Sequence, residues 1–280
     1  MHTMRGGCMT FPNSIARWSS RRTAGILFVS SVVGVLVLSG YSPAIASESD
    51  QRCGVATLIA VRGSYDGQAG SGTGATPYVY AHGTGGQGDM MAELITAFAV
   101  EQNIPVYIEA LRYPAVIYPD LTDDGYIESE RDGVIALRGE INSLAADCPD
   151  TTIQLAGYSQ GAHIIGDVLS DRTQLSVVAR QNLDGVVLFG DPAYRAGEPW
   201  DDSGNGGGDG RFARGKGELN AWDRTSTTSA TPVTMIHSWC VPDDLFCQSG
   251  TSAAAHQSYG NASTQLYAFE FLRSFLTTAD

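Results

Sequence analysis

Apolar and polar positions follow two different patterns along the chain. Short apolar runs, which are typical of buried strands, are separated by longer segments in which apolar residues recur every three or four positions, as on one face of a helix. The expected strands occupy residues 55–61, 106–111, 151–156, 186–189 and 233–239. The expected helices occupy residues 90–102, 129–146, 160–169 and 264–276. Strands that alternate with helices predict a parallel sheet covered on both faces, and hence one α/β domain.

The first part of the chain does not fit this alternation. Its first 23 residues contain four arginines and no acidic residue, and an apolar run of 15 residues follows. Ala44 and Ala46 then provide the small side chains that a signal peptidase reads. The pattern predicts a secretory signal peptide in residues 1–46 and one folded domain in residues 47–280.

An uncleaved membrane anchor is the alternative interpretation of the apolar run. The run is shorter than the roughly 20 residues that a transmembrane helix needs. Tyr41 stands where a lipoprotein would carry its lipidated cysteine. We therefore expect a secreted, extracellular protein with no stable membrane anchor. Arg21 and Arg22 leave the twin-arginine export route open beside the general secretory route.

Removal of the leader makes the protein strongly acidic. The whole chain has 17 basic and 30 acidic residues, a net charge of −13, and loss of the four leader arginines leaves 13 basic residues and a net charge of −17. Such a surface repels nucleic acid and anionic lipid. The expected partner is therefore neutral or uncharged, with no nucleic acid, and a monomer is the default oligomeric state.

Cysteine usage predicts a disulfide framework. One of the five cysteines leaves with the leader, and an even set remains in an exported chain: Cys53, Cys148, Cys240 and Cys247. Of three possible pairings we favour Cys240 with Cys247 and Cys53 with Cys148, because the first two are close neighbours in the sequence. In a chain-entropy model the long loop contributes about 4.7 kcal/mol and a ring of eight residues about 2.5 kcal/mol. The short bridge would mainly fix local geometry.

Two glycine-rich stretches resemble known ligand-binding motifs. Residues 203–217 contain seven glycines in fifteen positions, a composition that predicts a mobile surface loop. Within it, GNGGGDG resembles one calcium-binding nonapeptide repeat, but a single copy cannot stack, and no metal site is expected. Residues 83–88 match G-x-G-x-x-G, with Glu109 about 20 residues downstream, as in a dinucleotide site. The export signal favours instead a glycine loop before a helix at Asp89, with no cofactor.

The pentapeptide GYSQG, residues 157–161, lies directly between an expected strand and an expected helix. A serine on such a tight turn adopts a strained backbone conformation, and glycines two positions away on either side avoid clashes and expose the hydroxyl. The helix N-terminus favours the negative charge that develops on a bound acyl group. Ser159 is therefore the candidate nucleophile.

A nucleophilic serine needs a histidine base and an acid that orients it, and hydrolases with this turn carry them in the order serine, acid, histidine. The adjacent Asp243 and Asp244 lie between two cysteines, and His256 is the only histidine that follows them. The other histidines of the mature chain precede this pair and are interpreted as structural: His82, His163 and His237.

Several stretches together resemble the cutinase family of secreted serine esterases, which includes acetylxylan esterases and actinobacterial cutinase-like lipid esterases. The resemblance rests on CPDTTIQLAGYSQGAHI (148–164), CVPDDLFC (240–247), AAHQSYG (254–260), ATLIAVRGS (56–64) and FGDP (189–192). It covers most of residues 53–276. The combination of the GYSQGA turn with a C-x(3)-D-x-x-C loop is specific to this family.

The resemblance implies an α/β-hydrolase fold, a three-layer sandwich around a central, mostly parallel five-stranded sheet with no lid domain. It implies the triad Ser159, Asp244 and His256, because the family's acid lies four residues after the first cysteine of the loop. Asp243 would then be a solvated neighbour. The oxyanion hole would be Ser64 and the backbone N–H of Gln160. The same resemblance implies the two disulfides favoured above.

The implied activity is hydrolysis of carboxylic esters by two-step acyl transfer, without cofactor or metal. Short- to medium-chain acyl esters of a lipid or polyester are the first expectation. Acetylxylan esterase activity, phospholipase-type activity and a non-catalytic carbohydrate- or lipid-binding role stay open. Residues 65–80 and 203–231 look longer than in compact fungal cutinases, which leaves the size of the substrate open.

Overall fold

The structure is a computed structural model that describes residues 52–66, 86–101, 103–117, 124–225 and 232–276. These residues belong to one compact unit, residues 45–280. The expected signal peptide and His82 lie outside the described residues.

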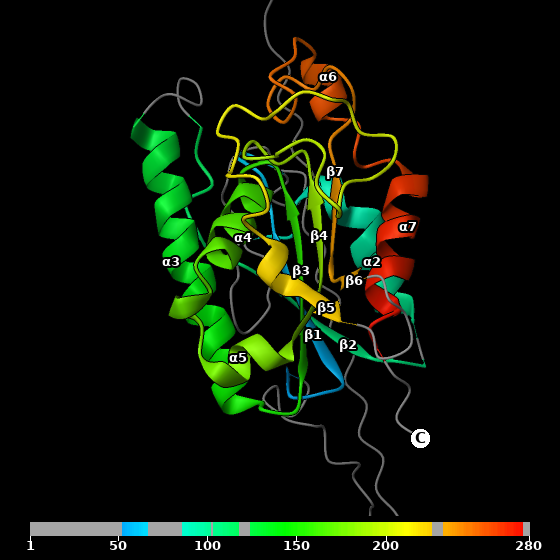
Figure 1. The fold of residues 1–280 in the computed structure, drawn as a ribbon. Coiled ribbons are helices and arrows are strands. Elements are labelled where there is room, and N and C mark those ends of the chain that lie inside the picture. Colours follow the sequence, from blue (N-terminus) through cyan, green and yellow to red (C-terminus); the bar gives the residue numbers. More distant parts are fainter. Residues whose placement is uncertain (1–51, 67–85, 102, 118–123, 226–231, 277–280) are drawn as a thin grey trace, which may run out of the picture. The chain divides into compact units, whose positions relative to one another are not determined.

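A five-stranded sheet forms the centre of this unit (Figure 1). Its strands are β1 (Ala56–Val61), β2 (Val106–Ala110), β3 (Thr152–Tyr158), β4 (Leu183–Phe189) and β7 (Ile236–Trp239). They lie in the order β2-β1-β3-β4-β7, and every neighbouring pair is parallel. The expected five-stranded sheet is confirmed. Because all strands run in one direction, their carboxyl ends meet at the same edge, where ligands of open α/β sheets bind.

Helices cover both faces of the sheet, so that the unit has three layers (Figure 1). One face carries α3 (Asp124–Asp147), α4 (Gln160–Ser170) and α5 (Val177–Asn182), and the other carries α2 (Ala92–Val100) and α7 (Ala262–Arg273). The remaining helices are short, α6 (Ala253–His256) and the 3-10 turns η1 (Asp89–Met91), η2 (Arg172–Gln174) and η3 (Asn220–Trp222). A separate antiparallel pair consists of β5 (Asp223–Thr225) and β6 (Pro232–Thr234).

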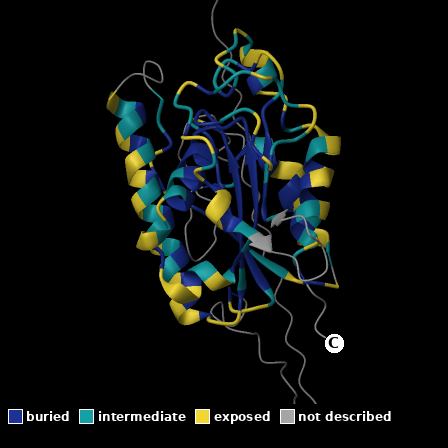
Figure 2. Cartoon of the chain, viewed as in Figure 1, coloured by how far each residue is buried: buried dark blue, intermediate teal, exposed yellow. Residues whose placement is uncertain are grey.

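Alternation along β1 shows why both faces need cover. Leu58 packs in one hydrophobic cluster with Phe98 of α2 and Leu272 of α7. Its neighbour Ile59 packs in the other cluster with Ile141 of α3. Successive side chains of a strand point to opposite faces, so an uninterrupted apolar strand requires helices on both sides. Figure 2 shows the result, with buried strands in the centre and exposed residues on the outer sides of the helices.

Two element boundaries differ from the expectation. Helix α3 begins at Asp124 rather than at residue 129, because its first turn buries Tyr126. The expected strand at 233–239 is divided, since Ile236 donates its N–H to Thr234 Oγ1 at 3.1 Å instead of continuing a ladder. The residues before this turn pair with β5, and those after it pair with β4.

Residues 203–217, expected to form a mobile surface loop, are hydrogen-bonded to neighbouring segments. Gly210 donates its N–H to Tyr194 O at 2.9 Å, Gly206 donates to Cys240 O at 3.1 Å, and Arg214 is buried. A glycine-rich segment buries little apolar side chain, but its backbone groups can still be satisfied by neighbouring segments. Composition alone does not report such bonds.

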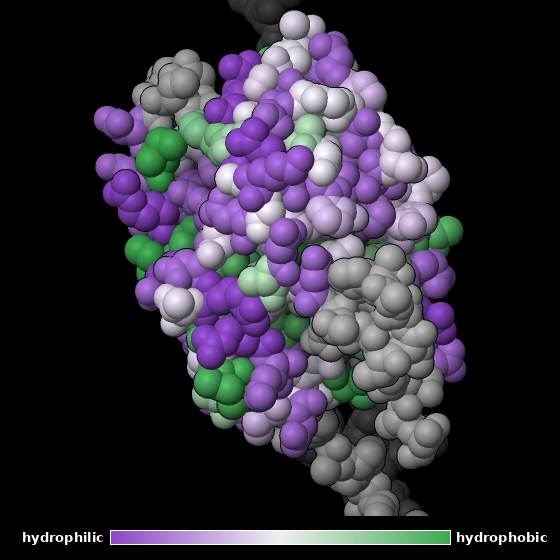
Figure 3. All heavy atoms as spheres, in the orientation of Figure 1, coloured by the Kyte–Doolittle hydropathy of each residue, from purple (hydrophilic) through white to green (hydrophobic). Residues whose placement is uncertain are grey.

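Within the described ranges, no helix has the length and apolar character that crossing a bilayer requires. Figure 3 shows one face of the molecule, on which hydrophobic residues are scattered among hydrophilic ones and do not gather into a single patch.

Candidate active site

Ser159 occupies the turn between β3 and α4 in a conformation that few non-glycine residues adopt. Its φ is 54° and its ψ is −120°. A residue in a sparsely populated region costs about 1–3 kcal/mol and persists only where its surroundings hold it. Here the Ser159 N–H donates to Phe189 O, at the end of β4, at 2.8 Å. The backbone strain expected at this serine is present.

The flanking glycines have identifiable steric reasons. A Cβ on Gly161 would lie 1.9 Å from Val61 O, and one on Gly157 would lie 2.8 Å from Ala162 N. Gly63, in the loop after β1, lies close to Ser159, since a Cβ on it would lie 3.1 Å from Ser159 Cβ. The three glycines allow β1, β3 and the start of α4 to approach one another at the serine.

The structure brings Ser159, His256 and Asp244 into one chain of hydrogen bonds. His256 Nε2 lies 2.8 Å from Ser159 Oγ. On the other side of the ring, Nδ1 lies 2.9 Å from Asp244 Oδ2 and 3.1 Å from Oδ1. The serine is 9% exposed, the histidine 5% and the aspartate 0%. This order of hydroxyl, imidazole and buried carboxylate is the arrangement that activates a serine for attack.

Asp244 is held ionised by its surroundings. Its Oδ1 accepts the N–H groups of Phe246 at 2.7 Å and Cys247 at 3.0 Å, and its Oδ2 accepts the hydroxyl of Tyr259 at 2.8 Å. Burial alone would raise the pKa of Asp244, but the hydrogen bond and charge of His256, with the two backbone donors, lower this pKa below its ordinary value. The carboxylate is therefore charged at neutral pH.

Asp243 faces away from the imidazole. It is exposed and has a φ of 63°. Its Oδ1 accepts the Thr251 N–H at 2.9 Å and the Thr251 hydroxyl at 3.1 Å. Of the two adjacent aspartates, only Asp244 reaches His256, and Asp243 closes a local turn.

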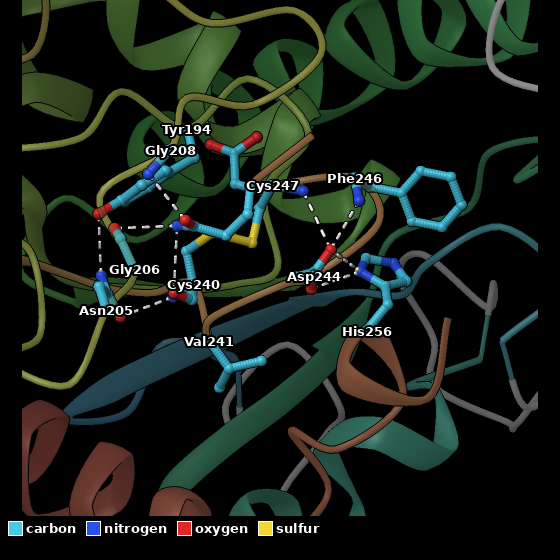
Figure 4. The surroundings of a disulfide bond; sticks show 12 residues. Tyr194, Asn205, Gly206, Gly208, Cys240, Val241, Asp244, Phe246, Cys247 and His256 are labelled. Atoms are coloured by element: carbon cyan, nitrogen blue, oxygen red, sulfur yellow. Dashed lines mark hydrogen bonds and ion pairs between the residues drawn. A yellow bond between two sulfur atoms is a disulfide. The ribbon is translucent and has the colours of Figure 1, made fainter. Parts of the chain in front are cut away.

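Both disulfides join the cysteine pairs favoured from the sequence. Cys53 is bonded to Cys148 across 95 positions, and Cys240 to Cys247 across seven. The shorter bridge closes a ring that contains Asp244. Figure 4 shows Asn205, Gly206 and Gly208 on one side of this bridge, and Asp244 and His256 on the other.

The glycine-rich segment 203–217 supplies hydrogen bonds to this ring. Asn205 accepts the Cys240 N–H at 2.7 Å. Just after the ring, Gln248 accepts the Gly208 N–H at 2.8 Å and donates to Gly206 O at 3.0 Å. The sequence offered no signal for these contacts, because they join residues 35 to 42 positions apart.

The loop after β1 lies beside Ser159, as the contact of Gly63 shows. The next residue, Ser64, has a buried hydroxyl with no hydrogen-bond partner among the described residues. Tyr65 follows with a φ of 52° and donates its N–H to Ala115 O at 3.0 Å, where Ala115 itself has a φ of 54°. Ser64 is thus a free donor on a strained loop.

Gln160 begins α4, so its backbone N–H belongs to the first turn, whose N–H groups have no partner within the helix. Its side chain is fully buried. The amide donates to Val116 O and to Tyr126 O, both at 3.2 Å, and accepts from Ser129 Oγ at 3.1 Å. The side chain therefore fixes the helix start against α3 and the loop that contacts Tyr65.

The remaining described histidines are structural in their contacts. His163 Nδ1 lies 2.9 Å from Tyr126 Oη, and His237 Nε2 lies 3.2 Å from Asp202 Oδ2. Burial lowers the pKa of both histidines. Among the described residues neither imidazole bonds to the Ser159 hydroxyl, and His163 meets Ser159 through a helical main-chain bond, from the His163 N–H to Ser159 O at 3.0 Å.

The dinucleotide interpretation conflicts with the contacts of its acidic residue. Glu109 lies in β2, is fully buried and pairs with Arg52, so it does not reach a ribose. Gly83 to Gly85 lie outside the described residues, whereas Gly88 packs tightly, since a Cβ there would lie 2.2 Å from Asp66 Oδ2. The described part of this glycine stretch supports the loop after β1.

One group of side chains outside the site has metal-ligand character. Glu130, His163 and Asp167 place possible ligand atoms within 4.8 Å of one another. The buried guanidinium of Arg214 donates to Asp167 Oδ1 at 3.0 Å and 3.1 Å, so a positive charge already occupies this position. The group fits a cation poorly.

Comparison with known proteins gives a consistent family. A family model described as Cutinase matches residues 74–276. Acetylxylan esterase 2 of Talaromyces purpureogenus is 30% identical over 55% of this chain and 66% of its own length. Cutinase 11 of Verticillium dahliae is 29% identical over 59% and 57%, so the chain spans less than two thirds of either relative. Carboxylesterase Culp1 of Mycobacterium tuberculosis is 30% identical over 64% and 68%.

Solved structures share the fold. An acetylxylan esterase solved at 0.90 Å superposes with a TM-score of 0.61 and 25% identity, over 80% of this chain and 100% of that one. A cutinase-like protein from Cryptococcus sp. superposes with a TM-score of 0.57 and 20% identity, over 80% and 96%, a similarity of fold alone.

Proposed function

This chain belongs to the cutinase family, and from that premise we propose that it is a secreted serine esterase that hydrolyses carboxylic esters. The observation that carries the proposal is the continuous chain of hydrogen bonds from Ser159 through His256 to Asp244. The names of the relatives, cutinase, acetylxylan esterase and carboxylesterase, support an ester as the substrate. Two disulfides and the expected signal peptide support export.

In the proposed first step, His256 Nε2 accepts the proton of Ser159 Oγ as this oxygen attacks the ester carbonyl carbon. The carbonyl oxygen becomes an oxyanion, for which Ser64 and the backbone N–H of Gln160 are the proposed donors. The unpartnered Ser64 hydroxyl and the position of Gln160 at a helix N-terminus support this assignment. The imidazolium then gives its proton to the departing alcohol.

In the second step, water attacks the acyl-enzyme with His256 again acting as the base. Asp244 remains ionised throughout, holds the Nδ1–H tautomer and stabilises the imidazolium. The four hydrogen-bond donors around its carboxylate keep it in that role. Besides the ester and water, the proposed mechanism uses groups of this chain.

Substitution of the nucleophile tests the proposal. Ser159→Ala should abolish hydrolysis of a short-chain p-nitrophenyl ester while thermal unfolding stays near that of the parent protein. Ser170→Ala, at the end of the same helix, is the matched control and should retain activity, since Ser170 Oγ only donates to Gly166 O. Undiminished hydrolysis by Ser159→Ala would contradict the proposed function.

The substrate class needs a separate experiment. We propose short- to medium-chain acyl esters of a lipid or polyester, and deacetylation of xylan is the second candidate, because an acetylxylan esterase is among the relatives by sequence and by structure. A series of p-nitrophenyl esters from acetyl to long-chain acyl, with acetate release from acetylated xylan in parallel, separates the two. A fluorophosphonate that fails to label the protein would favour a non-catalytic binding role instead.

A further inference from the structure

Tyr259 lies where the acid loop, the histidine and the last helix meet, and the mechanism above counts it only as one of four donors to Asp244. Its side chain is almost completely buried. The hydroxyl donates to Asp244 Oδ2 at 2.8 Å and accepts the Val241 N–H at 3.0 Å. One oxygen atom thus connects the carboxylate to the backbone of the disulfide ring that carries it.

The ring of Tyr259 is fixed from several directions. Gly190 has a φ of 60°, and a Cβ on it would lie 2.7 Å from Tyr259 Cε2 and 3.0 Å from His256 Cε1. The main chain of the same residue is held by Gln265 of α7, which donates to the Tyr259 backbone O at 2.9 Å. The ring also contacts that of Tyr158, with centroids 6.1 Å apart. A hydroxyl on so constrained a ring is a stationary donor.

The two oxygens of Asp244 receive different kinds of donor. Oδ1 receives two backbone N–H groups, from Phe246 and Cys247, and lies 3.1 Å from the imidazole Nδ1. Among the described residues, Oδ2 receives no backbone donor and bonds to the imidazole Nδ1 at 2.9 Å and to the Tyr259 hydroxyl. Without the Tyr259 hydroxyl, the remaining donor to Oδ2 would be the imidazole itself. The position of Oδ2 would then no longer be fixed independently of the ring that it has to orient.

We propose that Tyr259 is a positioning residue that aims Oδ2 of Asp244 at the imidazole of His256. This inference rests on the proposed function. Burial and the charge of Asp244 raise the pKa of Tyr259, so the hydroxyl remains protonated and donates throughout the working pH range. Tyr259 does not touch the reacting atoms, and it acts through the acid.

A second buried tyrosine provides the matched control. Tyr158 donates its hydroxyl to the backbone carbonyl of His256 at 2.8 Å, and its ring lies 5.1 Å from the imidazole. It therefore holds the main chain of the histidine and not the carboxylate. Tyr158→Phe and Tyr259→Phe each remove one buried hydroxyl, but only the second removes a donor from Asp244.

Other titratable groups bear on the same pH range. Asp66 acts on Tyr158 through its charge, and burial raises the pKa of Asp66 to about 6. An ionisation near that pH could produce an acid limb of its own in the rate profile. Asp66→Asn removes this ionisation, so Tyr158→Phe and Tyr259→Phe are each compared in the parent protein and in the Asp66→Asn variant.

The test is the pH profile of kcat/KM for a short-chain p-nitrophenyl ester. Tyr259→Phe should lower kcat about tenfold, the size of effect expected for loss of a hydrogen bond to a charged group, with KM nearly unchanged. Loss of the donor concentrates negative charge on Asp244 and stabilises the imidazolium. The acid limb should therefore move upward by about half a pH unit.

Proton NMR provides a readout that stability alone would not change. The His256 Nδ1–H resonance should shift in Tyr259→Phe and stay in place in Tyr158→Phe. An unchanged profile and resonance in Tyr259→Phe, with only a lower Tm, would overturn the inference. That outcome is distinguishable from failure of the proposed function, which Ser159→Ala reports independently. Fluorophosphonate labelling of Tyr259→Phe should persist at a reduced rate.

Discussion

The nucleophile and the acid of the proposed triad are placed by different means. Ser159 is positioned by main-chain sterics, through a strained φ of 54° and two glycines whose missing side chains let β1 and α4 close around the turn. Asp244 is positioned by a disulfide ring, by donors up to 15 positions away, and by bonds from residues 205–208 to the ring and to the residue after it. One placement is encoded in five consecutive residues, and the other draws on two separate segments, residues 205–208 and 240–259.

This difference predicts different responses to mutation. A local, steric placement fails abruptly when one added atom cannot be accommodated, because a backbone carbonyl does not yield as a flexible side chain does. A distributed placement weakens in steps, because each hydrogen bond contributes about 1 kcal/mol and the others remain. Three substitutions test this difference, in order of decreasing expected effect.

The largest effect should come from the acid itself. Asp244→Asn should lower kcat about 10⁴-fold, about 5.5 kcal/mol in activation free energy, because an amide cannot hold the imidazole in the required tautomer. Asp243→Asn is the control and should change turnover little, since an asparagine tolerates the left-handed backbone there and can still accept the Thr251 N–H. Steady-state kinetics of both variants on one ester decide the assignment. The reverse outcome would move the acid to Asp243.

The next effect should fall on stability. Gly161→Ala would place a Cβ 1.9 Å from Val61 O, so α4 and β1 must separate, and the free energy of unfolding should fall by about 3 kcal/mol or more. The control is Gly139→Ala in α3, where nothing lies within 4 Å of the added atom. That variant should gain about 0.5–1 kcal/mol from helix propensity. Urea denaturation measures both, and equal values would refute the steric explanation.

The smallest effect should come from the support of the acid ring. Gln248→Ala removes the bonds to Gly208 and Gly206, and unfolding should become easier by about 1–2 kcal/mol. Turnover should fall modestly, while fluorophosphonate still labels Ser159. Gln181→Ala, at an exposed position of α5, controls for loss of a glutamine and should be neutral. If Gln248→Ala lowered the free energy of unfolding as much as Gly161→Ala, the position of Asp244 would depend on a single local contact, as that of Ser159 does.

The same contrast explains what the sequence could predict. The apolar runs identified the strands, and the strain and glycines around Ser159 followed from five adjacent residues. The spacing of Asp244 from the cysteines, taken with a family resemblance, selected the acid whose carboxylate contacts His256. These features depend on short-range pattern, which a sequence displays directly.

Features that depend on tertiary contacts were missed or misjudged. No sequence pattern singled out Asn205 or Gln248, because the bonds that involve them join segments brought together only by folding. The glycine-rich segment appeared mobile since its composition lacks apolar side chains, yet its backbone is hydrogen-bonded to the acid ring. Tyr259 stood three positions after His256 in the quoted motif, but its contact with Asp244 could not be inferred from periodicity.

The order of the site residues along the chain has a consequence for biosynthesis. Ser159 precedes His256 by 97 positions, and Tyr259 and α7 come later still. If the chain is exported unfolded by the general secretory route, its serine emerges well before the proposed base, and the short disulfide can close only when Cys247 has emerged. The proposed triad is then assembled only after translocation of the segment that completes the fold.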